Sequence, residues 1–237
     1  MPNHVTNRLT GAKELIDSIM GEYEGKPCVD FNLVMPCPDY VWKGSVCLGV
    51  ESAAEIALGL IDWKNPPKNN ARDDFASGNY GGAASVLHYS NCLRQLQDGP
   101  FPKDFEDEDF EAFISFMRSY RACGVMHGLN WNTKFWGTKW NAYETNRLSD
   151  TVVTFETAWS APHPVIEKLA GKTTKTLLHE WADEDIGSNV GRIRYEDNTK
   201  EVQNLANTKE GYELAFDLNK CGDDYVLVDG KYEYKED

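Results

Sequence analysis

Two short motifs pair a histidine with a hydroxyl residue two positions later: His4-Val5-Thr6 and His88-Tyr89-Ser90. When two such motifs face each other across strands, one histidine can act as base and the other as acid on a 2′,3′-phosphate. The pattern therefore predicts a phosphodiesterase in which His4 and His88 are the catalytic pair. The position of His88 argues against it, because residues 83–97 are predicted to form a helix. A three-residue pattern also arises easily by chance, so this activity is the last of three alternatives.

A second group of candidate ligands surrounds His179. Glu180 follows it directly, and three acids stand at 183–185. The segment alternates as a strand entering a turn, so the side chains of His179 and Glu180 should point to opposite faces. A zinc helix would need H-E-x-x-H, which is absent. The sequence has no P-loop, no G-x-S-x-G and no C-x-x-C among its six cysteines, and we expect neither a metal nor a cofactor.

The richest aromatic segment lies between residues 131 and 141. Its rings are Trp131, Phe135, Trp136 and Trp140, interleaved with Asn132, Lys134, Lys139 and Asn141. Aromatic faces beside cations can stack bases and hold phosphates, and tryptophan is also frequent at the centre of protein interfaces. Large aromatic side chains are nevertheless mostly core residues. We therefore expect the rings to be structural first, with Lys139 and Asn141 as the binding candidates of this segment.

Acidic residues dominate the charge of the chain. Lysine and arginine number 24 and aspartate and glutamate 38, which gives a net charge of −14. Six acids fall within residues 104–111: Asp104, Glu106, Asp107, Glu108, Asp109 and Glu111. Acids at the start of a helix also favour its dipole, so the cluster has a plain structural explanation. The functional alternative is a surface that attracts a basic partner, with further acidic patches at 180–197 and 223–237.

Composition narrows the class of protein. Hydrophobic residues make up 41% of the 237 residues, enough for a proper core. We see no apolar run long enough to span a membrane and no signal peptide, so we expect a cytoplasmic protein with reduced cysteines. The negative charge disfavours nonspecific nucleic-acid binding, which needs lysine and arginine at the phosphates.

Periodicity places these residues on elements. Alternation predicts strands at 4–10, 29–35, 151–159, 174–182 and 189–196, and 3.6-residue spacing predicts helices at 12–23, 52–61, 83–97, 110–120, 164–170 and 208–220. Residues 225–234 should form a hairpin around Asp229-Gly230. In the strand at 151–159 we expect Val153, Phe155 and Trp159 on the buried side. The order indicates an α+β fold: a core at 1–44 and 149–237, and a largely helical insertion at 45–148.

Four stretches carry a resemblance to a known family: MPNHVTNRLTG, WGTKWNA, FETAWSAPHPVIEKLA and ADEDIG. They resemble the YubB-type ferredoxin-like domain family of phage and conjugative-plasmid proteins. The resemblance implies a ferredoxin-like antiparallel sheet and an origin in a mobile genetic element. It implies no particular activity.

These observations favour a non-enzymatic, acidic binding protein. Its partner would be a basic host protein or nucleoprotein complex, such as a CRISPR-type defence complex that the protein inhibits. The alternative is an accessory protein that binds nucleic acid or a nucleotide through the aromatic and lysine segment. No membrane partner is expected.

Overall fold

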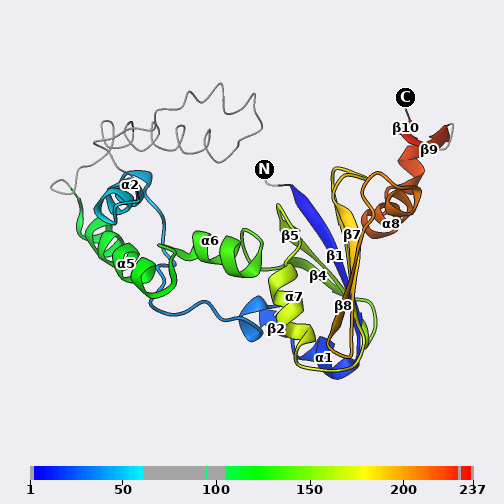
Figure 1. The fold of residues 1–237 in the computed structure, drawn as a ribbon, viewed down its shortest axis with the longest axis horizontal. Coiled ribbons are helices and arrows are strands. Elements are labelled where there is room, and N and C mark those ends of the chain that lie inside the picture. Colours follow the sequence, from blue (N-terminus) through cyan, green and yellow to red (C-terminus); the bar gives the residue numbers. More distant parts are fainter. Residues whose placement is uncertain (1–2, 61–93, 95–104, 229–230, 236–237) are drawn as a thin grey trace. The chain divides into compact units, whose positions relative to one another are not determined.

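The structure is a computed structural model that describes residues 3–60, 94, 105–228 and 231–235 (Figure 1). The contacts divide the chain into two compact units. The first comprises Met1–Cys37 and Asn132–Asp237, and the second comprises Pro38–Trp131. The division falls at 37/38 and 131/132, whereas the sequence placed the insertion at 45–148.

A six-stranded antiparallel sheet forms the centre of the first unit, with the strand order β4-β5-β1-β6-β7-β8. Its strands are β1 His4–Gly11, β4 Tyr143–Arg147, β5 Val152–Ala158, β6 Leu177–Asp183, β7 Val190–Glu196 and β8 Thr199–Asn204. Asn7 of β1 lies opposite Phe155 on one side and Trp181 on the other. The N-terminal strand is therefore central, and the strands predicted at 4–10, 151–159, 174–182 and 189–196 are confirmed.

Helices pack on both faces of this sheet. α7 (His163–Ala170) lies on the face that carries His179, since the ring of His163 contacts the rings of His179 and Trp181. α8 (Lys209–Asn219) packs on the opposite face, where Ala182 and Val190 join its apolar side in one buried cluster. Alternate side chains of these strands are therefore buried on the two faces of the sheet. The fold class is α+β, as predicted.

The buried face of β5 confirms two of three predicted residues. Val153 and Phe155 are 0% and 1% exposed, but Trp159 is 48% exposed. The strand ends at Ala158, and Trp159 has a φ of +74°, outside the β region. Alternation therefore stops one residue before the tryptophan, and its predicted burial was wrong.

The predicted elements after β1 were also wrong. The helix predicted at 12–23 is only α1 (Lys13–Asp17), followed by strand β2 (Met20–Tyr23). β2 pairs with β3 (Lys26–Val29) around Glu24 and Gly25, whose φ angles of +50° and +75° suit a type I′ turn. Residues Phe31–Leu33, expected in a strand, form the 3-10 turn η1.

Two strands of the main sheet escaped prediction. β8 follows β7 through Asp197 and Asn198, both with positive φ, and all of its residues are exposed. It has no apolar alternation to reveal it. β4 lies inside the predicted insertion but pairs with β5, and its register shifts between Tyr143 and Asn146. Glu144, in that shift, has a φ of +46°.

The second unit is helical in the residues described. α2 (Leu48–Ala57) and α5 (Asp107–Cys123) share a buried cluster with Val50, Phe116 and Met126, and α6 is Gly128–Trp131. The helix predicted at 110–120 is confirmed, and the one predicted at 52–61 begins at Leu48. The helix predicted at 83–97 lies, apart from residue 94, outside the described residues, as does His88.

The remaining elements belong to the first unit. The π-helical segment η3 (Asn132–Trp136) buries Trp136, which is 4% exposed and donates from Nε1 to the carbonyl of Met35 at 2.8 Å. The hairpin predicted near the C-terminus is β9 (Tyr225–Val228) and β10 (Lys231–Tyr234) after the turn η4 (Gly222–Asp224). Among the helices of the described ranges, none has the length and apolar character of a membrane span.

Candidate binding groove

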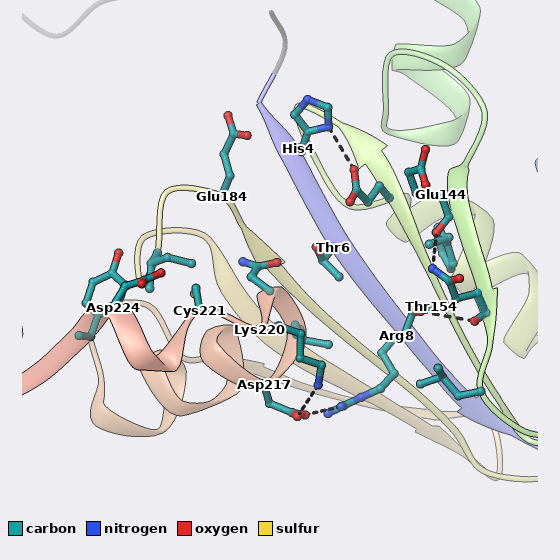
Figure 2. Close-up of a pocket in the computed structure, with 18 of the residues that line it drawn as sticks. His4, Thr6, Arg8, Glu144, Thr154, Glu184, Asp217, Lys220, Cys221 and Asp224 are labelled. Carbon is teal, nitrogen blue, oxygen red and sulfur yellow. Dashed lines mark hydrogen bonds and ion pairs between the residues drawn. The ribbon is translucent and has the colours of Figure 1, made fainter. Parts of the chain in front are cut away.

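A groove of about 770 Å³ opens on the face of the sheet that carries α8 (Figure 2). Its floor is β1, where alternation places His4, Thr6 and Arg8 on the same side. Strands β4 and β5 line one side, with Glu144 and Glu156. The end of α8, the loop after it, the hairpin and the β6–β7 turn supply further lining residues, among them Asp217, Lys220, Cys221, Asp224, Tyr234 and Glu184. All these elements belong to the first unit.

The lining is acidic. Five carboxylates, from Glu144, Glu156, Glu184, Asp217 and Asp224, face two permanent cations, Arg8 and Lys220. Both cations are already engaged by Asp217, which bonds Lys220 at 3.1 Å and Arg8 on its other oxygen. Hydrogen bonding to Arg8 lowers the pKa of Asp217, so this carboxyl stays ionised. The remaining four carboxylates give the groove its negative character.

Arg8 holds the floor of the groove to the elements beside it. Its Nη2 lies 2.7 Å from Glu180 Oε2 on β6. Its Nη1 bonds Asp217 on α8, as Figure 2 shows. Burial alone would lower the pKa of Arg8, but the hydrogen bonds to Asp217 and Glu180 outweigh it and raise the pKa. On the other side of Glu180, Arg192 Nε lies 3.8 Å from Oε1. This network fixes α8 on the sheet and leaves Arg8 little freedom to bind a ligand.

Three carboxylates of the groove are available to a ligand. Glu144, Glu184 and Asp224 are exposed, and within the described part of the chain none of their side chains has an ion-pair partner. They come from β4, the β6–β7 turn and η4, so they surround the groove rather than form a run in the sequence. An arrangement of this kind attracts cationic groups through the summed field of separate charges.

His4 lies at one end of the groove in a small polar cluster. Its Nδ1 is 2.8 Å from the hydroxyl of Tyr143 and 3.2 Å from Glu156 Oε2. Burial, with the charge of Glu156 and other acids, raises the pKa of Tyr143 to about 12, so the phenol stays protonated and can donate to His4. Because both neighbours meet the same ring nitrogen, the other nitrogen, Nε2, is the one left for a ligand or a proton transfer.

Groups that would indicate catalysis are few in the groove. Cys221 is the lining thiol, and burial with the charge of Asp224 raises its pKa, which disfavours the reactive thiolate. His4 is the histidine among the lining residues. Within the described ranges, no group of three or more His, Cys, Asp or Glu residues could hold a metal ion.

The acids predicted at 104–111 lie elsewhere. Asp104 falls outside the described residues. Glu106 is the N-cap residue of α5, and Asp107, Glu108 and Asp109 form its first turn, with Glu111 exposed just beyond. They belong to the second unit and line no part of the groove. Their placement fits the structural explanation, a charged helix start that favours the dipole.

The other two predicted binding residues differ from each other. Lys139 is half-buried, and its Nζ lies 4.7 Å from the ring centre of Trp140 and 4.4 Å from that of Trp159. Asn141 is half-buried: its Oδ1 accepts from the Phe31 amide at 2.9 Å, and its Nδ2 donates to Asp30 at 2.8 Å. The amide of Asn141 therefore connects η1 to the segment before β4, which is a structural task.

The acidic patches at 180–197 and 223–237 contain two lining residues of the groove, Glu184 and Asp224. The alternation of β1 already placed His4 and Arg8 on one face, and that of β5 placed Glu156 on the face opposite Phe155. What no pattern indicated is that β4, α8 and the two turns converge there. The left-handed Glu144 in the irregular β4 is typical of irregularities that re-aim a side chain at a sheet edge.

Comparison with known families agrees with the fold. Residues 135–220 match a family model described as the ferredoxin-like domain in Api92-like protein, and this range runs from η3 through α8. The chain contains a ferredoxin-like domain. This result confirms the predicted fold. β1, β2 and β3 lie outside the matched range.

One solved structure also matches, the crystal structure of a protein api92 from Yersinia pseudotuberculosis. The two chains are 10% identical, with 86% of this chain and 99% of that one covered at a TM-score of 0.32. A likeness at this level carries no argument about function. A comparison with curated proteins gave no match.

Proposed function

We propose that this protein is a non-enzymatic binding protein whose groove on the α8 face of the ferredoxin-like domain takes a basic segment of a partner protein. The observation that carries the proposal is the trio of exposed carboxylates of Glu144, Glu184 and Asp224 around the groove, which have no ion-pair partner among the described residues. The net charge of −14 adds long-range attraction for the same class of partner. The groove's own cations add no site for an anion, because Asp217 already engages Arg8 and Lys220.

In its finer form, the partner is a basic protein or nucleoprotein complex in the cytoplasm of a host cell. A phage or plasmid protein of the YubB type would block a CRISPR-type defence complex in this way. The support for this form is the resemblance of FETAWSAPHPVIEKLA and the related stretches, together with the acidic charge. A bound acidic protein would compete with the phosphates that a nucleoprotein complex normally holds.

The test compares two triple variants that remove the same charge. Glu144→Gln, Glu184→Gln and Asp224→Asn neutralise the groove, while Glu106→Gln, Asp107→Asn and Glu108→Gln neutralise the start of α5. Binding of a nona-lysine peptide is measured by calorimetry at low and high salt. The proposal predicts that the groove variant loses affinity at least roughly tenfold, about 1.4 kcal/mol, and that the α5 variant stays close to wild type. Equal losses would mean that only net charge matters, and a loss confined to the α5 variant would move the site to residues 104–111.

The two-histidine phosphodiesterase remains a second candidate on one observation: His4 and Thr6 both line the groove. His4 Nε2 would act as the acid or base at a phosphate. The assay is hydrolysis of 2′,3′-cyclic nucleotides by the wild type and by His4→Ala. Turnover that His4→Ala abolishes would establish the enzyme. Turnover absent from the wild type would remove this candidate.

The nucleic-acid alternative depends on Lys139 and its neighbouring rings. A shift of single-stranded DNA by the wild type that Lys139→Ala abolishes would favour it over the acidic groove. A protein of net charge −14 should show no such shift at physiological salt.

A further inference from the structure

Two exposed indole rings share one cation on the surface of the first unit. The ammonium of Lys139 lies 4.7 Å from the ring centre of Trp140 and 4.4 Å from that of Trp159, within the range of a cation–π interaction. Trp140 is 39% and Trp159 48% exposed. Within the part of the chain that the structure describes, Lys139 ion-pairs with no carboxylate. The two rings are therefore its main electrostatic partners.

The backbone around these rings is firmly held. Thr138, which is 1% exposed, donates from Oγ1 to the carbonyl of Ala158 at 2.8 Å, and the amide of Trp159 donates to the carbonyl of Asn3 at 2.8 Å. Ser160 adds a hydrogen bond from its hydroxyl to the carbonyl of Gly137. The two tryptophans are therefore positioned by the fold, whereas Lys139 reaches them on a flexible stem.

The backbone of Trp159 is strained. Its φ of +74° lies in the left-handed region, which is a genuine outlier for a bulky side chain. Alternation along β5 would otherwise have directed this ring into the core. Strain of this kind persists where the surrounding structure imposes it, and it concentrates at ligand sites. A strained backbone that holds a large apolar ring half in solvent suggests that the exposure is used.

We infer that Trp140 and Trp159 form a recognition site for an arginine side chain of a basic partner protein, and that Lys139 occupies this site in the free protein. The inference rests on the proposed function in taking the partner to be basic. Guanidinium is planar, stacks on aromatic faces and is more weakly hydrated than ammonium. It therefore gains more from two indole faces than the lysine it replaces, and the displaced Lys139 returns to water.

The structure offers a variant that removes a ring and relieves the strain together. Glycine tolerates positive φ without steric cost, so Trp159→Gly should fold and keep its secondary structure by circular dichroism. Trp140→Ala removes the other ring at an exposed position. Lys139→Ala removes the internal competitor and leaves both rings in place.

The experiment measures binding of nona-arginine and nona-lysine peptides, which carry equal charge, by calorimetry. The wild type should prefer nona-arginine, and Trp159→Gly and Trp140→Ala should each weaken nona-arginine binding by roughly twofold to thirtyfold. Lys139→Ala should strengthen it, because a competing cation is gone. Unchanged nona-arginine affinity in both tryptophan variants, or weaker binding in Lys139→Ala, would overturn the inference. A decathymidine oligonucleotide bound by wild type and lost in Lys139→Ala would replace it with a nucleic-acid site.

The groove variant separates this inference from the proposed function. Neutralising Glu144, Glu184 and Asp224 could weaken the binding of both peptides while Trp159→Gly weakens the binding of neither. This result would support the groove and contradict the arginine site. If Trp159→Gly removes the preference for nona-arginine while the groove variant binds both peptides as the wild type does, the result would support the arginine site and contradict the groove.

Discussion

Arg8 and Glu180 lie directly opposite each other in the antiparallel pair β1–β6, and their side chains form an ion pair of 2.7 Å. The side chain of Glu180 is 9% exposed and that of Arg8 22%. Arg8 continues to Asp217 on α8. Arg8 thus connects strands β1 and β6 with α8, the helix that lines one side of the groove.

Removal of Glu180 alone should destabilise the protein. Glu180→Ala leaves Arg8 and Arg192 without the carboxylate that faces both, and breaking a buried ion pair in this way costs about 3–5 kcal/mol. Since Arg8 retains Asp217 and is partly exposed, we expect the lower end of that range. Urea unfolding followed by circular dichroism measures the loss. In the double variant Arg8→Met with Glu180→Leu, apolar packing replaces the ion pair, and part of the lost stability should return. A loss below about 1 kcal/mol in Glu180→Ala would show that the ion pair is dispensable.

The aromatic segment should divide into structural and surface residues. Trp136 is 4% exposed and donates a hydrogen bond to Met35, so Trp136→Ala should cost roughly 3–5 kcal/mol. Lys139→Ala should change stability by less than about 0.5 kcal/mol, because Lys139 is only half-buried and its ammonium contacts two exposed rings. Thermal melts of the two variants, compared with wild type, give both numbers. Equal melting temperatures for all three proteins would contradict the structural role of Trp136.

The protein should lose stability as the pH falls below about 6.5. Burial lowers the pKa of His179 well below the ordinary histidine value of 6.5, and burial also lowers the pKa of His163, whose ring contacts that of His179. As the pH falls, these two histidines therefore bind protons in the unfolded chain before they do so in the folded chain. Stability is fully present above the unfolded pKa and declines as the pH falls towards the folded values.

Chemical unfolding at several pH values between 7.5 and about 5 measures this dependence. His179 donates from Nε2 to Asn7 Oδ1 at 3.0 Å, because the amide nitrogen of Asn7 already donates to Val5 and Thr157. His179→Gln can keep that donor without a titratable ring. Its stability should vary less with pH than that of the wild type, and an identical pH profile would show that His179 contributes nothing to it.

Strands with apolar alternation could be predicted from the sequence, and polar strands could not. In β5, Val153 and Phe155 stand two positions apart and are buried as expected. β8 reads Thr-Lys-Glu-Val-Gln-Asn and lies exposed at the sheet edge, so its pairing with β7 depends on the turn at Asp197-Asn198. Recognising Glu24-Gly25 as a similar turn would have predicted the β2–β3 hairpin and shortened the helix expected at 12–23.

The candidate site was less predictable, because it is assembled by tertiary structure. His4 was singled out by its motif, but Glu144, Glu184 and Asp224 stand far apart in the sequence and converge only in the fold. Of the conspicuous run at 104–111, the described acids from Glu106 onward instead begin a helix of the other unit. Local charge density in the sequence was therefore an uneven guide: the acidic patches at 180–197 and 223–237 contribute Glu184 and Asp224 to the groove, and Glu144 lies in neither.

In the proposed function, a basic segment of a partner binds in the groove between β1, β4 and the end of α8. The most direct measurement is a two-dimensional ¹H–¹⁵N NMR titration of the wild type with the nona-lysine peptide. The largest and saturable shifts should fall on the amides of His4, Thr6, Glu144, Glu184 and Asp224, and they should diminish in the groove triple variant. Shifts concentrated on residues 106–111 of α5, or spread evenly over all acidic residues, would contradict the claim.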